Sequence, residues 1–269
     1  MEATAASAPD VASTEAGVQV FRAPFEPSNL RPRKVGEPVK EYSLPRNLDY
    51  EILKDPQMAM ENKPGYFVVF QDALEHGLRL PLPPFAVTVL RYYQIHPSIL
   101  QAQSWRFIIS FLVRCLKSGV TVTMGLFKEF HTLSSSPSKR GFYFKSRAGQ
   151  KKLLAENTKT VKSWGGKYFM VKNLIGFTPC SWCDTLDTVR LNQRMVLTGD
   201  EKADLGRLST LAPEEVGYVV FEDCLRRVGL SMSQGRRVRL ELEEEIPMGV
   251  RRERGLDAWD EPASSTTIQ

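Results

Sequence analysis

The chain has 269 residues, of which 42% are hydrophobic, and its formal net charge is +5. This composition is ordinary for a globular protein and is enough to bury a sizeable core in one or two domains. Its most apolar run is shorter than the ~20 residues of a membrane span, and the first residues lack a signal-peptide pattern. We therefore expect an intracellular protein with no membrane partner, whose four cysteines are ordinary reduced thiols.

The two ends of the chain differ in composition from its middle. Residues 1–44 are rich in Ala, Ser, Pro and Thr, and residues 231–269 are charged and end in EPASSTTIQ. Segments with few large apolar side chains bury too little surface to offset the entropy of the free chain. We therefore expect disordered tails on either side of one domain over residues 45–230.

Hydrophobic spacing and capping residues predict that this domain is mainly α-helical. Pro84 suits the first turn of a helix, Thr123 suits an N-cap, and Gly77, Gly119 and Gly229 suit helix ends. The helices are expected over about residues 47–60, 66–76, 84–96, 103–117, 124–133, 201–208 and 213–228.

The helix over 103–117 is apolar nearly all round, which is typical of a helix at the centre of a core. The helices over 84–96 and 124–133 present apolar faces toward it. The residues that we expect to anchor the core are Phe85, Tyr92, Trp105, Ile108, Ile109, Leu112, Phe127 and Trp164.

Two aromatic segments alternate as β-strands do. They are GFYFKSR over residues 141–147 and KYFMVKN over residues 167–173. We expect them to pair with each other, which would add a small two-stranded antiparallel element to the helical domain.

The segment that contains both strands is strongly basic. Between residues 139 and 172 the one acid is Glu156, so the segment carries +9 and the rest of the chain −4. Basic side chains neutralise phosphates, and exposed rings of this segment would stack on unpaired bases. The alternative is a ribbon whose rings pack inward and whose lysines only keep it soluble. The residues expected to contact nucleic acid are Lys139, Arg140, Lys145, Arg147, Lys151, Lys152, Lys159, Lys162, Lys167 and Lys172.

Patterns for catalysis, metals and cofactors are missing from the sequence. Cys180 and Cys183 have the spacing of a metal knuckle, but neither Cys115 nor Cys224 stands in the second pair that a zinc site needs. Aspartic-protease, reverse-transcriptase, phosphate-loop and nucleophile-elbow motifs are also absent. We expect no cofactor, no metal and no small-molecule substrate, and we lean against an enzyme.

Residues from Phe67 to Val171 resemble the plant gypsy-type transposon domain, also labelled gypsy-type transposase. The resemblance rests on the run GLRLPL from Gly77 to Leu82, the Trp105–Arg106 pair, the Phe-rich helix around Phe127, and Trp164 shortly before Tyr168 and Phe169. It implies descent from a plant retroelement. It implies no catalytic residues, because the family has none established.

Three functions remain open from the sequence. The first is a non-enzymatic binding or assembly module that contacts nucleic acid through residues 139–172. The second is a Gag-like scaffold that associates with itself or with other proteins. The third is a divergent recombination enzyme, since spacing alone does not exclude an integrase-like trio of acids.

Overall fold

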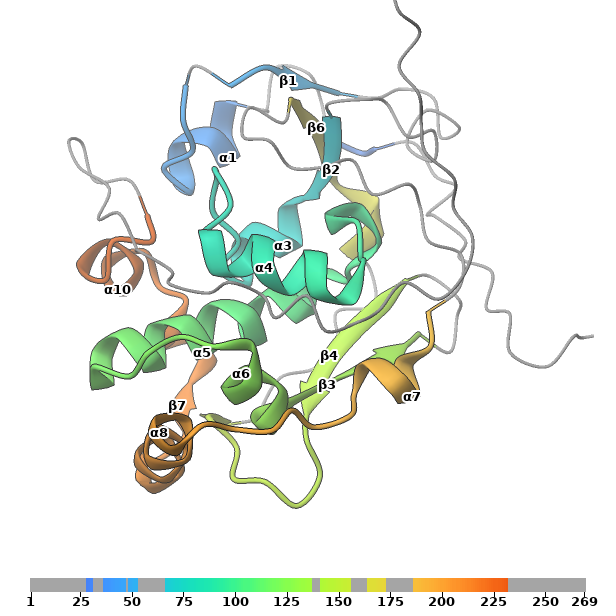
Figure 1. Cartoon of the computed structure of the whole chain (residues 1–269). Coiled ribbons are helices and arrows are strands. Elements are labelled where there is room, and N and C mark those ends of the chain that lie inside the picture. Colours follow the sequence, from blue (N-terminus) through green and yellow to red (C-terminus); the bar gives the residue numbers. More distant parts are fainter. Residues whose placement is uncertain are drawn as a thin grey trace, which may run out of the picture.

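A computed structural model describes residues 28–30, 36–46, 48–52, 66–136, 141–155, 164–172 and 186–231. About 48% of its residues are helical and 17% are in strands, so the fold is mixed α/β (Figure 1). The expectation of a mainly α domain is therefore only partly right. The physical reason is that several strands are buried on both faces and lack the alternation that marks a strand in sequence.

The folded part begins before residue 45. Helix α1 (Gly36–Glu41) lies within the predicted N-terminal tail, and Leu30 and Leu44 are buried in the core. The expectation of a disordered tail is wrong for these positions. Short apolar stretches that flank a helix can be anchored by contacts that local composition does not reveal.

A three-stranded antiparallel sheet follows, in the order β1 (Tyr50–Glu51), β6 (Tyr168–Lys172) and β2 (Tyr66–Phe70). Val68 lies opposite Met170 in the register. The predicted helix over 66–76 is wrong in its first half, because only α3 (Gln71–Glu75) is helical. Consecutive residues of β2 are buried, so their apolar spacing also matched a helix.

The central helices agree with the prediction. They are α4 (Pro84–Tyr93), α5 (Trp105–Ser118) and α6 (Met124–Phe130), with the 3₁₀ turns η2 (Pro97–Ile99) and η3 (Ala102–Ser104) between α4 and α5. Pro84 opens α4, Gly119 ends α5 with a φ of 60°, and the Thr123 hydroxyl accepts from the backbone N–H of Leu126. Figure 1 shows α5 near the middle of the molecule, where it contacts α4, α8 and α9.

The second sheet corrects the predicted strand pairing. Strand β4 (Phe142–Ser146) pairs with β3 (His131–Ser135), with Phe144 opposite Leu133. It does not pair with β6, whose partners are β1 and β2. Both predicted strands exist. Each pairs with a segment for which the sequence predicts a helix or no regular structure.

Among the described residues, seven further elements follow β4 besides β6. They are β5 (Leu154–Ala155), η4 (Trp164–Gly166), α7 (Thr188–Leu191), α8 (Gly199–Thr210), β7 (Glu214–Glu215), α9 (Val216–Val219) and α10 (Glu222–Arg227). Of these, α8 contacts both α5 and α6, and α9 contacts α5. Strand β7 pairs in parallel with β5. The predicted helix over 213–228 is therefore divided into β7, α9 and α10, whereas the helix predicted near 201–208 is present as α8.

Most of the expected core anchors are buried. Tyr92 is half-buried, and the side chain of Trp164 lies outside the described part of the chain. The anchors exposed by 1% or less are Phe85, Trp105, Ile108, Ile109, Leu112 and Phe127. Ring contacts at 5.4–5.8 Å between centroids join Phe85, Phe111 and Phe127 across α4, α5 and α6. No helix in the described ranges is long and apolar enough to cross a membrane.

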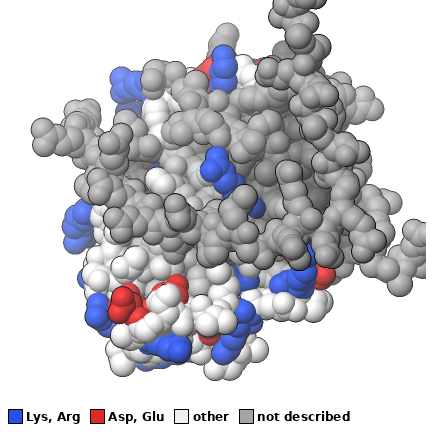
Figure 2. All heavy atoms as spheres, in the orientation of Figure 1, with Lys and Arg blue, Asp and Glu red and all other residues white. Residues whose placement is uncertain are grey.

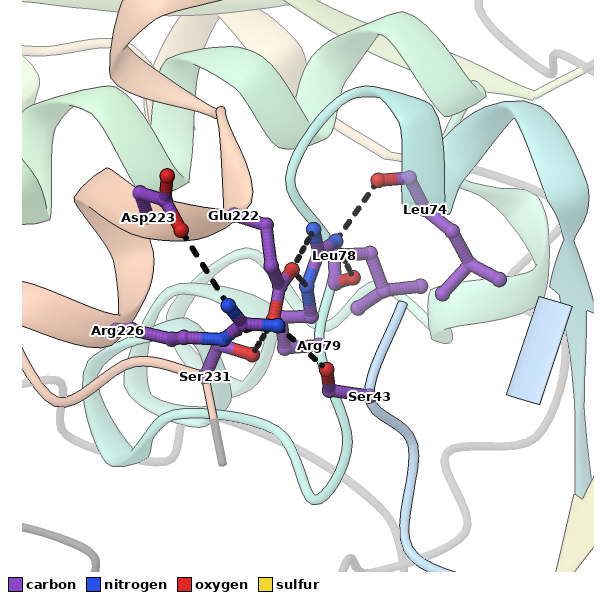
Figure 3. Close-up of polar contacts among 8 residues, drawn as sticks. All are labelled: Ser43, Leu74, Leu78, Arg79, Glu222, Asp223, Arg226 and Ser231. Atoms are coloured by element: carbon purple, nitrogen blue, oxygen red, sulfur yellow. Dashed lines mark hydrogen bonds and ion pairs between the residues drawn. The ribbon is translucent and has the colours of Figure 1, made fainter. Parts of the chain in front are cut away.

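A buried polar network joins the start of the domain to its end (Figure 3). Arg79 donates to the backbone oxygens of Leu74 and Leu78, at 2.9 and 2.8 Å, and to the carboxylate of Glu222 in α10. Ser231 donates to the other carboxylate oxygen of Glu222. Arg226 reaches Ser43, which follows α1, at 3.4 Å. Arg79, Arg226 and the carboxylate of Glu222 thus connect three segments that are distant in sequence.

Candidate nucleic-acid interface

The structure separates the basic residues that the sequence groups together. Lys167 and Lys172 lie at β6, in the three-stranded sheet. Lys145, Arg147, Lys151 and Lys152 lie in β4 or in the segment after it. Lys139, Arg140, Lys159 and Lys162 lie outside the described residues.

The surroundings of the two groups differ in charge. Burial raises the pKa of Asp72 and Glu75 in α3, and the charge of Lys167 nearby acts against that rise. Lys172 follows the backbone of Asp49, to which its N–H donates at 3.1 Å. Asp72 and Glu75 therefore offset the charge of Lys167, and the candidate interface narrows to the surface around β4.

The rings of the basic segment are mostly in the core. Phe142, Phe144, Tyr168 and Phe169 are each exposed by 3% or less, and only Tyr143 is half-buried. Phe142 and Phe144 alternate inward along β4, whereas Tyr143 and Lys145 lie on the other face with Thr132 and Ser134 of β3. The expectation that exposed rings stack on bases is wrong for the four buried rings.

Arg147 carries a positive charge and also holds neighbouring segments together by hydrogen bonds. Its Nε donates to the backbone oxygen of Lys128 at 2.6 Å, and Nη2 donates to that of Asn192 at 2.9 Å. The side-chain amide of Asn192 in turn pairs with the backbone of Leu133, at 2.8 and 2.7 Å. These bonds fasten the end of α7 to the edge of β3.

This docking brings in two arginines that the sequence analysis missed. Arg190 and Arg194 lie on α7 and just after it, and both are exposed. The two arginines are four residues apart in the sequence. The apolar pattern around them is too weak, however, to predict that they lie beside β4. The side chain of Arg194 is 3.4 Å from the carboxylate of Glu129 in α6.

Lys128 lies near Arg147, Arg190 and Arg194 and is the fourth cation of this region. It is 1% exposed, its ammonium donates to the Tyr92 hydroxyl, and it lies 4.4 Å from the centroid of the Tyr92 ring. Burial, and then the charge of Arg147, lower its pKa to about 8. No carboxylate in the described part of the chain pairs with this ammonium.

We call Lys128, Arg147, Arg190 and Arg194 the β4–α7 cationic cluster. After burial, the charge of Arg194 further lowers the pKa of Arg147, so the members are close enough to repel one another. Glu129 and the α7 N-cap Asp187 offset part of the charge. Blue side chains gather over α7 and beside it at the lower right of Figure 2. The net charge of this region is positive, and an anion would relieve the repulsion.

Residues 68–135 match a protein-family model described as "Putative gypsy type transposon". We call residues 68–135, which are similar to this family, the gypsy-type segment. The match is well short of half of the chain, and it supports the resemblance noted from the sequence over that stretch. No curated protein and no solved structure matches this chain.

The gypsy-type segment supplies the centre of the fold but only part of the charged surface. It contains α3 to α6 and β3, and with them Tyr92, Lys128 and Glu129. Arg147, Arg190 and Arg194 come from the chain that follows it. The cationic cluster is therefore built where the gypsy-type segment meets the rest of the domain.

The cysteines give no metal site in the part that the structure describes. Cys115 and Cys224 are buried free thiols, and Cys180 and Cys183 lie outside the described residues. Within the described ranges no three His, Cys, Asp or Glu side chains group as metal ligands would.

Proposed function

We propose that this chain is a non-enzymatic, retroelement-derived module that binds nucleic acid inside the cell. It holds the phosphate backbone with the β4–α7 cationic cluster and with Lys145 and Lys151 beside it. The observation that carries the proposal is the convergence of cations from α6, β4 and α7, which are far apart in sequence. Basic side chains that converge in this way neutralise neighbouring phosphates.

The same structure supports a weak and sequence-independent mode of binding. Four of the rings that would stack on bases are buried, so the affinity comes mainly from charge. Electrostatic binding falls steeply with salt, because each phosphate contact releases a counterion. A labelled single strand followed by fluorescence anisotropy should therefore bind at low ionic strength and be released as salt rises.

A matched pair of variants locates the surface. Lys145→Glu with Lys151→Glu reverses two charges beside the cluster, and Lys167→Glu with Lys172→Glu reverses two charges at β6. The net charge changes equally in both. The first pair should abolish binding and the second should leave most of it. Arg147 is left unchanged, because its bonds to Lys128 and Asn192 hold the fold. A flat titration for the wild-type chain, or equal losses in both variants, would refute the proposal.

Self-association is a second candidate, favoured by one observation. Tyr218 of α9 and Phe221 beside it are 52% and 60% exposed. Large exposed rings are common at protein–protein contacts. Light scattering after size-exclusion chromatography should then show oligomers that grow with concentration and disappear when both rings are changed to Ser. A monomer at all concentrations would exclude this candidate.

A further inference from the structure

We propose that the Tyr92 hydroxyl, polarised by Lys128, is the central donor of a site for a single phosphate group. The inference rests on the proposed function and narrows it, since it names one position at which a phosphate is held. Its ligand chemistry is a phosphate oxygen, supplied either by a nucleic-acid backbone or by a free phosphate compound.

The first step is the direction of the hydrogen bond. An ammonium only donates, so the phenol oxygen of Tyr92 accepts from Lys128. The phenol's own proton is then left to donate, and no acceptor for it exists among the described side chains and backbone. Tyr92 is half-buried near the end of α4, so part of its side chain faces solvent, and we infer that a ligand reaches the hydroxyl from that side.

The second step concerns charge. A hydroxyl that accepts from a cation is a stronger donor, because hydrogen bonds in a chain polarise one another. Burial raises the pKa of Tyr92, so the phenol keeps its proton at neutral pH. Lys128, with a pKa of about 8, is mainly charged there.

The third step concerns the positive charges around the Tyr92 hydroxyl. Arg190 is near enough to Tyr92 to act against the rise in its pKa, and Arg147 repels Lys128. Tyr93, the other tyrosine packed here, has its ring 5.1 Å from that of Tyr92. Glu129 is paired with Arg194, so its charge is partly offset. An anion at the Tyr92 hydroxyl would therefore be attracted by Lys128, Arg147 and Arg190 together.

The experiment uses the full chain and two probes. Inorganic pyrophosphate, followed by titration calorimetry, reports on the single site, and a labelled single strand, followed by anisotropy, reports on the whole surface. Tyr92→Phe removes one oxygen, and Lys128→Met replaces the ammonium with an apolar side chain of similar length. Each should weaken pyrophosphate binding by roughly tenfold, the usual effect of losing a hydrogen bond to a charged group. Tyr143→Phe, at another half-buried tyrosine, is the control and should change nothing.

The outcomes separate this inference from the proposed function. If the wild-type chain binds the single strand but not pyrophosphate, and Tyr92→Phe binds the strand equally well, the phosphate site is refuted and the function stands. If neither probe binds, both fail. If pyrophosphate binds and all three variants respond alike, the Tyr92 hydroxyl is not the donor. Because Tyr92→Phe removes a single oxygen from a half-buried side chain, the test does not depend on whether Lys128→Met folds.

Discussion

The guanidinium of Arg79 and the carboxylate of Glu222 form an ion pair across 143 residues of sequence, with Nε and Nη2 at 3.0 and 2.7 Å from the same oxygen. The side chain of Arg79 is 5% exposed and that of Glu222 16%. Burial alone would raise the pKa of Glu222, but the hydrogen bond from Ser231 and the charge of Arg79 lower it. The pair therefore stays ionised and fastens α10 to the gypsy-type segment.

Glu222→Gln should destabilise the protein by about 3 kcal/mol, because removing one member of a buried ion pair leaves the other charge uncompensated. Urea unfolding at neutral pH measures the change. Asp223→Asn is the matched control on the same helix: Asp223 is 61% exposed and its contact with Arg226 lies at the surface. Its effect should stay below about 1 kcal/mol. Equal unfolding midpoints for the two variants would contradict a structural role for the pair.

Tyr93→Phe should leave stability unchanged or raise it by about 1 kcal/mol. The Tyr93 hydroxyl is buried and has no hydrogen-bond partner among the described atoms, so it is desolvated without compensation. Tyr50→Phe provides the contrast, because that hydroxyl donates to the backbone oxygen of Pro45 at 2.5 Å and its removal should cost about 1 kcal/mol. Thermal melts of both variants decide this. A clear loss for Tyr93→Phe would mean that its hydroxyl does have a partner.

Stability should fall as the pH drops below about 6.5. Burial lowers the pKa of His96 to about 4 and that of His131 to about 3, from an ordinary value of 6.5. Below pH 6.5 the two histidines of the unfolded chain therefore bind protons that those of the folded chain do not. The free energy by which the neutral, buried histidines favour the folded state is fully present above pH 6.5, and it is lost as the pH falls toward their folded pKa values. His131→Phe should reduce the loss between pH 6.5 and 4.5 by about 2–3 kcal/mol. A variant with the wild-type pH slope would show that His131 titrates normally.

Lys128 predicts the same dependence, a stability that rises with pH, in the alkaline range. Burial and Arg147 lower its pKa from 10.5 to about 8, so between these values the unfolded chain binds the extra proton and stability rises with pH. The rise should be visible between pH 8 and about 9.5, before tyrosines of the unfolded chain ionise near pH 10. Lys128→Met should abolish it and should be at least as stable as the wild-type chain at pH 7. Melts in a buffer without phosphate test this, and a rise that persists in Lys128→Met would assign it to another group.

The sequence determined those features that a few neighbouring residues decide. Pro84 and Thr123 predicted where α4 and α6 begin, and Gly119 predicted where α5 ends. Such caps depend on backbone geometry within one helical turn. The continuous apolar character of α5 likewise identified the centre of the core. The two aromatic segments were predicted as strands because aromatic residues favour strands, which is a local preference.

Only the tertiary structure decided which segments meet. Strand β4 pairs with β3 instead of β6, and β2 is a strand although its buried residues have helical spacing. The six described basic residues of segment 139–172 separate into a group at β4 and after it and a group at β6. Arg190 and Arg194 instead join Lys128 and Arg147 where Asn192 fastens α7 to β3. These outcomes depend on burial and hydrogen bonds between residues tens of positions apart. Local propensity carries no information about such contacts, because their energy exists only once the chain has brought both partners together.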